Sequence, residues 1–281
     1  METGTRWMCG MLAALTTGFC VGITAPRMPA QEPAAAVFAQ QTEENLFAQT
    51  APAADGFTIE VLGTDVQTQP KRVLIYHSHT YEAYEQTDER YRETEKWRTA
   101  DNAHNVVRVG EELAALLRSH GLEVVHDSTA FEPPTLSTAY TRSLQMLENR
   151  QAAGETYDLY IDLHRDAYAA SSTGKNTVNV GGVETARLML LVGKGEGQTG
   201  QGFDVKPDWP TNLAIAQRVT DALNDQAEGL CRDVCVKSGR FNQHIASGCV
   251  LVEAGNNHNT LEEVLSAMPW LADAIVQVLE N

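Results

Sequence analysis

Segments of two kinds alternate along the chain from about residue 72 to the C-terminus. Short apolar runs that are typical of strands lie at 72–77, 122–127, 158–164 and 249–255. Longer stretches with apolar residues at helical spacing lie at 105–121, 136–152, 211–227 and 260–279. Two parallel strands need a long crossover between them, usually a helix, so this alternation favours a parallel sheet. We therefore expect an α/β fold, with a mostly parallel sheet and helices on both of its faces.

Signals at the ends of these segments refine the prediction. Residues 176–193 predict a hairpin that turns at a Gly-Gly pair. Thr211 is the expected N-terminal cap of the third helix. Thr260 and Glu263 fit a capping box at the start of the last helix, and Pro269 should kink or divide that helix.

The N-terminal part of the chain is expected to lie outside the folded domain. Residues 7–25 contain no charged side chain, and a helix of that length nearly spans a hydrocarbon layer of ~30 Å. We expect a cytoplasmic start at 1–6, a transmembrane anchor or signal segment at 7–25, and a solvated linker at 26–56. Cleavage after Ala30 is the alternative to an uncleaved anchor. The catalytic domain would then cover residues 57–281.

The charge of the chain limits the partners that it can bind. The formal net charge is −16 and the isoelectric point is about 4.8. A protein that binds nucleic acid through its phosphate backbone needs a basic face. We therefore expect no nucleic-acid partner.

The cysteines give a weaker indication. Cys231 and Cys235 lie four residues apart, and a disulfide between them requires a turn that brings their Cα atoms within about 7 Å. A zinc site on this pair is disfavoured because no second pair accompanies it. We favour free thiols.

Polar residues follow three of the predicted strands, at the point where each strand ends. In a parallel sheet, ligands bind at the carboxyl ends of the strands. The three groups are His77, His79 and Glu82; His164, Arg165 and Asp166; and Glu253 with Asn256. Two imidazoles and one carboxylate form a catalytic zinc set that leaves a fourth position for water. The sequence therefore predicts a zinc site with a separate carboxylate as general base.

Several assignments within this site stay open. Either His77 or His79 could be the ligand; His79 has the H-x-x-E spacing to Glu82, which would leave His77 to a supporting role. Glu253 follows three apolar residues and is expected to be buried, so it is either catalytic or paired with Arg165 or Arg240.

Three further residues are candidates for substrate binding or support of the site. Arg165 could pair with Asp166 or bind a substrate carboxylate. His244 lies one segment before the Glu253 strand and is a candidate for the cleft, and Asn256 follows Glu253 closely.

Five motifs in order resemble the stage II sporulation protein P family, which is similar to zinc N-acetylmuramoyl-L-alanine amidases of cell-wall turnover. They are LIYHSHTYEAY, NVVRVGEEL, DLHRDA, RFNQH and VLVEAGNNHNTLEE, and the resemblance covers roughly residues 70–281. It implies an amidase fold of the phosphorylase/hydrolase-like kind. It also implies a membrane-anchored peptidoglycan amidase with its catalytic domain on the extracytoplasmic side. Such an enzyme would act in engulfment with stage II sporulation proteins D and M.

The resemblance also implies roles for individual residues. His79, Glu82 and His164 would be zinc ligands, and Glu253 would be the catalytic glutamate. In the wider amidase family the glutamate ligand lies further along the chain, at the head of the first helix. Here that region offers Asp101 or His104, which are the alternatives to Glu82.

Two other classes of function remain open. One is another zinc peptidase or amidohydrolase, such as a carboxypeptidase-like enzyme, whose strand-end site would look the same. The other is a non-catalytic module that binds the cell wall. The resemblance also implies an endopeptidase activity on cross-links, about which the residues themselves say nothing.

Overall fold

The computed structural model describes residues 69–87, 90–169, 176–197 and 203–280. The predicted anchor at 7–25, the linker at 26–56 and the first residues of the predicted domain lie outside these ranges. Within the described ranges, no helix has both the length and the apolar character that a membrane crossing requires.

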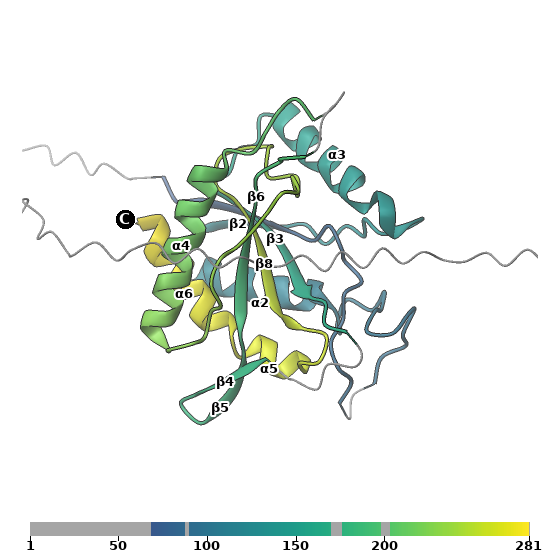
Figure 1. The fold of residues 1–281 in the computed structure, drawn as a ribbon, viewed down its shortest axis with the longest axis vertical. Coiled ribbons are helices and arrows are strands. Elements are labelled where there is room, and N and C mark those ends of the chain that lie inside the picture. The colour runs from purple at the N-terminus through teal and green to yellow at the C-terminus, as the bar shows by residue number, and fades with distance from the viewer. Residues whose placement is uncertain (1–68, 88–89, 170–175, 198–202, 281) are drawn as a thin grey trace, which may run out of the picture. The chain divides into compact units, whose positions relative to one another are not determined.

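A six-stranded sheet forms the centre of the described unit (Figure 1). Its strand order is β2-β1-β3-β8-β6-β7. The strands are β1 (Arg72–Tyr76), β2 (Glu123–His126), β3 (Leu159–Asp166), β6 (Leu188–Gly193), β7 (Cys235–Lys237) and β8 (Cys249–Asn256). All neighbouring pairs are parallel except β6 and β8, which are antiparallel. The prediction of a mostly parallel sheet is confirmed.

Helices pack on both faces of this sheet, as the sequence predicts. They are α2 (Val106–Ser119), α3 (Ala139–Ala152), α4 (Trp209–Gln226), α5 (Leu261–Leu265) and α6 (Met268–Glu280), with a short 3₁₀ turn, η1 (Leu136–Thr138), before α3. Side chains of a strand alternate between faces. Val73 and Ile75 accordingly join the larger core with α2, α4 and α6. Leu74 and Tyr76 join a smaller core with Leu147 of α3.

Most segment boundaries agree with the sequence, and the differences have local causes. The hairpin of β4 (Thr177–Val180) and β5 (Val183–Ala186) forms as predicted, with its turn at two glycines of positive φ. The third helix begins at Trp209 rather than at the expected cap Thr211, because a proline fits the first turn of a helix. Strand β7 has only three residues and was not predicted.

The end of the chain confirms the capping box and the division of the last helix. The Thr260 side chain accepts a hydrogen bond from the Glu263 backbone, and the Glu263 side chain accepts one from the Thr260 backbone. The helical segment then divides into α5 and α6, and Pro269 lies in the first turn of α6. Proline is tolerated there because the backbone N–H of that turn needs no helical partner.

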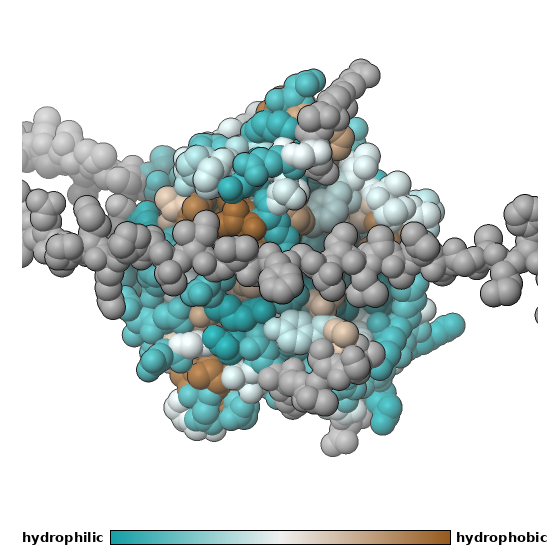
Figure 2. Space-filling model, viewed as in Figure 1, coloured by the Kyte–Doolittle hydropathy of each residue, from teal (hydrophilic) through white to brown (hydrophobic). Residues whose placement is uncertain are grey.

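The described unit has scattered hydrophobic areas on the face drawn in Figure 2 and two buried free thiols. On the face drawn in Figure 2, brown hydrophobic areas are small and separated by hydrophilic ones. Cys231 is a free, buried thiol, so the considered bridge from Cys231 to Cys235 does not form. Cys249 is also a free, buried thiol.

Gly110 of α2 packs against two histidines, His77 after β1 and His126 at the end of β2. A Cβ atom at this position would lie 2.7 Å from His77 Nε2 and 2.7 Å from His126 Nε2. We therefore expect Gly110→Ala to destabilise the protein by about 1 to 3 kcal/mol through overpacking. This loss should exceed the gain of about 1 kcal/mol in helix propensity. Thermal unfolding should show a melting temperature lower by several degrees, roughly 2–4 °C per kcal/mol.

Glu111→Ala is the control for this prediction. Glu111 is the exposed neighbour of Gly110 in the same helix, and such surface changes usually stay within about 0.5 kcal/mol. An unchanged or raised melting temperature for Gly110→Ala would contradict the packing that we describe.

Candidate metal centre

Three of the predicted site residues meet at the carboxyl ends of β1 and β3. His79 and Glu82 lie in the loop after β1, and His164 lies near the end of β3. One ligand atom from each residue lies within 4.8 Å of the others. The Glu82 carboxylate stands between the two rings, with Oε1 3.4 Å from His79 Nδ1 and Oε2 3.3 Å from His164 Nδ1. This cluster has the composition of a metal site.

Glu82 occupies the head of α2 in space although it precedes that helix by many residues. The backbone oxygen of Glu82 accepts a hydrogen bond from Val106 N at 2.9 Å, and Val106 is the first residue of α2. Asn105 caps the helix by accepting from Val107 N at 2.9 Å. The loop between residues 83 and 105 therefore returns the chain to the same place. Glu82 therefore lies next to the first residue of α2 in space.

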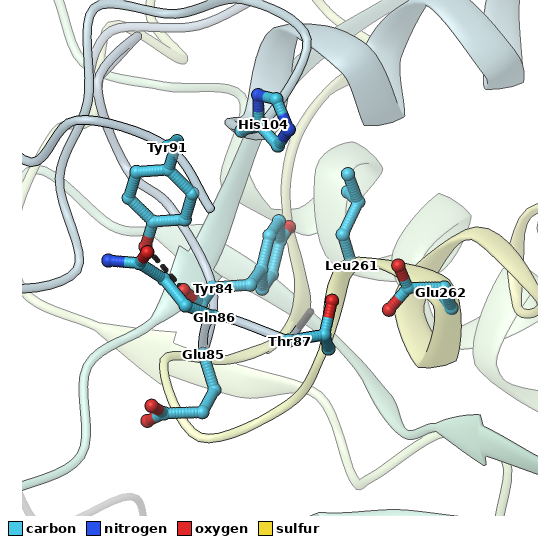
Figure 3. A pocket seen from close by; sticks show the side chains of 8 residues that line it. All are labelled: Tyr84, Glu85, Gln86, Thr87, Tyr91, His104, Leu261 and Glu262. Carbon is cyan, nitrogen blue, oxygen red and sulfur yellow. Dashed lines mark hydrogen bonds between the residues drawn. The ribbon is translucent and has the colours of Figure 1, made fainter. Parts of the chain in front are cut away.

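Asp101 and His104, the alternatives to Glu82, lie elsewhere. Their side chains face each other, with His104 Nδ1 3.0 Å from Asp101 Oδ2. His104 borders a small pocket with Tyr84 and Tyr91, in which Tyr91 Oη donates to Tyr84 O at 2.5 Å (Figure 3). Within the described part of the chain, the His79–Glu82–His164 cluster is the group of three that could hold a metal ion.

Asp162 orders the loop that carries His79, a role that the sequence analysis did not assign. Its Oδ1 accepts from Ser78 N at 2.8 Å, and its Oδ2 accepts from Ser78 Oγ at 2.7 Å. Its Oδ1 also lies 2.8 Å from His164 Nε2. The period of two in a strand places Asp162 and His164 on the same face. That spacing is the signal that could have identified Asp162.

Glu82 and His164 are buried side by side, and each shifts the pKa of the other. Burial alone opposes the charged form of His164, yet Asp162 and Glu82 hold its pKa well above the usual value. Burial opposes ionisation of Glu82 as well, but His164, His79 and Arg165 hold its pKa well below the usual value. A buried charge is stable only when it is paired.

Glu253 lies next to His164 across the β3–β8 pair, in direct register. Burial raises the pKa of Glu253 to about 8, Glu82 and Asp166 add to this rise, and His164 opposes it. Its Oε2 atom is buried and has no hydrogen-bond partner among the described residues. A buried carboxylate oxygen without a partner is costly and points to a functional role.

Arg165 does not pair with Glu253. Its guanidinium donates to three backbone oxygens, those of Ala83, Asp166 and Trp97, at 2.9, 3.3 and 3.1 Å. Its own backbone N donates to Glu82 Oε2 at 3.1 Å. Arg165 therefore holds the Glu82 loop against β3. Its contact with a substrate carboxylate stays a prediction.

Asp166 pairs with a different arginine. Its Oδ2 atom accepts from Arg232 Nη2 at 2.6 Å, and the same guanidinium donates to Tyr168 Oη at 3.0 Å. The ion pair of Asp166 with Arg165 that the sequence suggested does not form. Asn256 is fully buried and organises the turn after β8, where its Oδ1 accepts from His258 N at 2.8 Å.

His77 is not part of the cluster and instead contacts residues of β2 and β3. Its Nδ1 lies 2.8 Å from the Leu163 backbone oxygen, and its Nε2 lies 2.9 Å from His126 Nε2. Burial lowers the pKa of His77 to about 3, and His126 adds to this. His77 is therefore neutral, and its two ring nitrogens have partners. Of these two histidines, His79 is the one that belongs to the group of residues that could hold a metal ion.

Tyr140 of α3 covers the two imidazoles of the cluster. Its ring is stacked on His164 at a centroid distance of 6.3 Å and meets His79 edge to face at 5.2 Å. The sequence does not predict this contact, because a tyrosine in an amphipathic helix gives no sign of what it faces. The His244 side chain lies further along the same side of the sheet, in a groove beside α3.

The arrangement has the donors that zinc prefers. Two imidazoles and one carboxylate from the protein are a common set in catalytic zinc sites, and they leave one position open. Asp162 and Arg165 fix the orientation of the donor residues, as outer partners of metal ligands usually do. The residues present therefore fit a zinc ion, with an unpaired carboxylate, Glu253, beside them.

The fold and this cluster together define a mixed α/β protein with a candidate metal centre at the carboxyl end of its sheet. Residues 27–276 match the sequence model of the stage II sporulation protein P family. The chain belongs to that family.

One curated relative and two solved structures illustrate the similarity. Stage II sporulation protein P of Bacillus subtilis (strain 168) is 25% identical over 219 residues, which are 74% of this chain and 51% of that protein. The chain thus spans about half the length of this relative. N-acetylmuramoyl-L-alanine amidase AmiC2 of Nostoc punctiforme has a TM-score of 0.45 at 14% identity, over 75% of this chain and 98% of that one. The CwlD amidase from Clostridioides difficile, solved in complex with the GerS lipoprotein, has a TM-score of 0.46 at 12% identity, over 75% and 96%.

Proposed function

We propose that this protein is a zinc-dependent peptidoglycan hydrolase that cleaves the amide between N-acetylmuramic acid and L-alanine of the stem peptide. The observation that carries the proposal is the His79–Glu82–His164 cluster with Glu253 beside it at the same sheet edge. Membership of the stage II sporulation protein P family supports a role in cell-wall remodelling during sporulation.

Each residue of the site has a separate task in this proposal. His79, Glu82 and His164 would hold the zinc ion. When bound, zinc supplies a Lewis acid that polarises a carbonyl group and lowers the pKa of water. In its ionised form, Glu253 accepts the proton of the attacking water at its unpartnered Oε2 and returns it to the nitrogen of the leaving L-alanine. The C–N bond of the amide breaks, and a lactyl carboxylate and a free amine form.

Tyr140 and Asp162 prepare the site without taking part in proton transfer. The Tyr140 ring lies against His79 and His164 and so helps to fix their orientation. Asp162 holds Ser78, and through it the loop of His79, in place. Such positioning lowers the reorganisation that the reaction requires.

Product chemistry tests the proposed reaction. We expect purified peptidoglycan treated with the protein and zinc to release stem peptides that begin with a free L-alanine amine, without new reducing sugar ends. Mass spectrometry of the soluble products gives this result directly, and treatment with a chelator should abolish it. Release of a single C-terminal amino acid would instead indicate a carboxypeptidase. Retention on peptidoglycan without any product would indicate a wall-binding module.

We also propose a membrane-anchored location with the catalytic unit on the extracytoplasmic side, based on the uncharged segment at residues 7–25. Action in engulfment with stage II sporulation proteins D and M stays a prediction. Fractionation of the full chain tests the anchor, because an anchored chain requires detergent for extraction. A chain in the aqueous fraction that begins at Gln31 would indicate a cleaved signal instead.

A further inference from the structure

An open groove runs beside α3, and one of its lining residues, Tyr140, also meets the rings of His79 and His164. Its cavity volume is about 1070 Å³. Pockets for a single small molecule usually have about 300–1,000 Å³. Helix α3 contributes one side of the groove, including Tyr140, Thr141, Leu144 and Glu148; the other side comes from Phe203, Asp204, Val205 and the segment from Gly239 to Ile245. Since Tyr140 also covers His79 and His164, the groove and the cluster share one wall.

The far wall of the groove is built by a strained and firmly held segment. Phe241 and Asn242 have φ values of 47° and 54°, in the left-handed region that non-glycine residues rarely adopt. Asn242 Nδ2 donates to Tyr140 O at 2.8 Å and to Ser143 Oγ at 3.0 Å. A Cβ atom on Gly239 would lie 2.6 Å from the Phe241 ring. Strain of this kind persists where the surrounding structure holds it, and it often marks binding sites.

The lining of the groove combines ring faces with polar groups. Tyr140 and Phe241 pack edge to face at 6.1 Å, and the Arg240 guanidinium lies 4.5 Å from the Phe203 ring centre. The buried Nδ1 atom of His244 has no hydrogen-bond partner among the described residues. Burial and Arg240 lower the pKa of His244 to about 4. The neutral ring can both donate and accept a hydrogen bond.

The charges of the groove favour a neutral ligand. Its described lining residues include two carboxylates, Glu148 and Asp204, and one guanidinium, Arg240. A peptide with free carboxylates would meet this excess of negative charge unfavourably. An uncharged sugar chain would not be repelled by this negative charge. Its C–H faces pack on aromatic rings, and its hydroxyl and acetamido groups form hydrogen bonds with polar partners.

We propose that this groove binds the glycan strand of the substrate and so places the scissile amide at the metal cluster. This inference rests on the proposed function, because it assigns the groove to the sugar side of the same bond. The size of the groove means that sugars beyond the one that carries the cleaved amide lie in it. The enzyme should therefore prefer long glycan strands over a single-sugar substrate.

A pair of matched variants tests this assignment. Thr141 lines the groove and is exposed on α3, so Thr141→Trp should fill the groove without disturbing the core. Gln145→Trp places the same side chain at an exposed position of the same helix that does not line the groove. His244→Ala removes the unpartnered ring nitrogen.

Hydrolysis would be measured on two substrates with the same stem peptide, a single muramic acid and an uncrosslinked glycan strand. We expect Thr141→Trp to lower kcat/KM on the strand by about 10-fold or more and to leave the single-sugar value within about 2-fold, since only remote binding energy is lost. His244→Ala should change the ratio in the same direction, and Gln145→Trp should not change it. Equal losses on both substrates would overturn the assignment, and so would a loss that follows the length of the peptide.

A binding measurement separates this inference from the proposed reaction. Uncharged strands of N-acetylglucosamine contain neither the scissile amide nor a lactyl carboxylate, so their affinity can be measured by calorimetry even if the protein hydrolyses neither substrate. We expect the unaltered chain and Gln145→Trp to bind these strands, and Thr141→Trp to bind them at least about 10-fold more weakly. Binding without hydrolysis would contradict the proposed amidase but support the groove. Hydrolysis with no glycan affinity and no length preference would contradict the groove alone.

Discussion

Glu253→Gln should lose amide hydrolysis while it keeps the fold and the metal. Glutamine has nearly the shape of glutamate but cannot accept a proton at neutral pH, and loss of a general base typically costs about 10²–10⁴ in rate. Glu253 lies in register with His164 but outside the cluster of possible ligands, so the zinc content should not change. Turnover, zinc content and melting temperature would be measured on one preparation.

Glu262→Gln is the matched control for this change. Glu262 is an exposed carboxylate of α5, and it borders the small pocket around His104 rather than the metal cluster. Its activity should equal that of the unaltered protein. Near-normal turnover of Glu253→Gln would make Glu253 a structural carboxylate and would redirect the search to Asp166. Loss of zinc together with activity would make Glu253 a ligand.

The sequence predicts the sheet and its site edge because both depend on local patterns. Apolar runs of four to eight residues between amphipathic helices predict parallel strands, and polar residues at strand ends then converge. On this basis the sequence alone places four residues at the edge formed by the carboxyl ends of the strands: His79, Glu82, His164 and Glu253. The antiparallel pairing of β6 with β8 could not be predicted, since it depends on which sheet edge the chain reaches after the hairpin.

The partners of the site residues could not be predicted from local patterns. Arg165 was expected to bind an acidic group, but it donates to backbone oxygens from the loop at residues 83–97. A loop of this length carries no periodic signal, so its path over the strand ends is unknown from the sequence. For the same reason, the sequence could not show that Glu82 reaches the head of α2. The stacking of Tyr140 depends on the angle at which α3 crosses the sheet, which is set by packing.

His79→Ala should lose the metal, whereas His104→Ala should keep it. His79 belongs to the cluster within 4.8 Å, and His104 pairs with Asp101 in a separate pocket. Changes in the outer partners of a ligand cost about 10–100-fold in metal affinity, so loss of a ligand should cost on the order of 100-fold or more. The unaltered chain should bind about one zinc ion. Metal analysis after dialysis against a weak chelator gives the comparison.

His79 is the better of the two histidines for this test because its removal should leave the fold intact. Its side chain is 25% exposed, whereas that of His164 is 4% exposed and lies between Asp162 and Glu82. Removing His164 would leave the buried carboxylates of Asp162 and Glu82 without the ring that lies between them, and loss of a buried polar partner destabilises a protein by about 1–3 kcal/mol. Zinc lost from His164→Ala could therefore reflect unfolding, but zinc lost from a folded His79→Ala could not. Zinc retained by His79→Ala and lost from His104→Ala would move the metal centre to Asp101 and His104, and the assignment of Glu253 would fall with it.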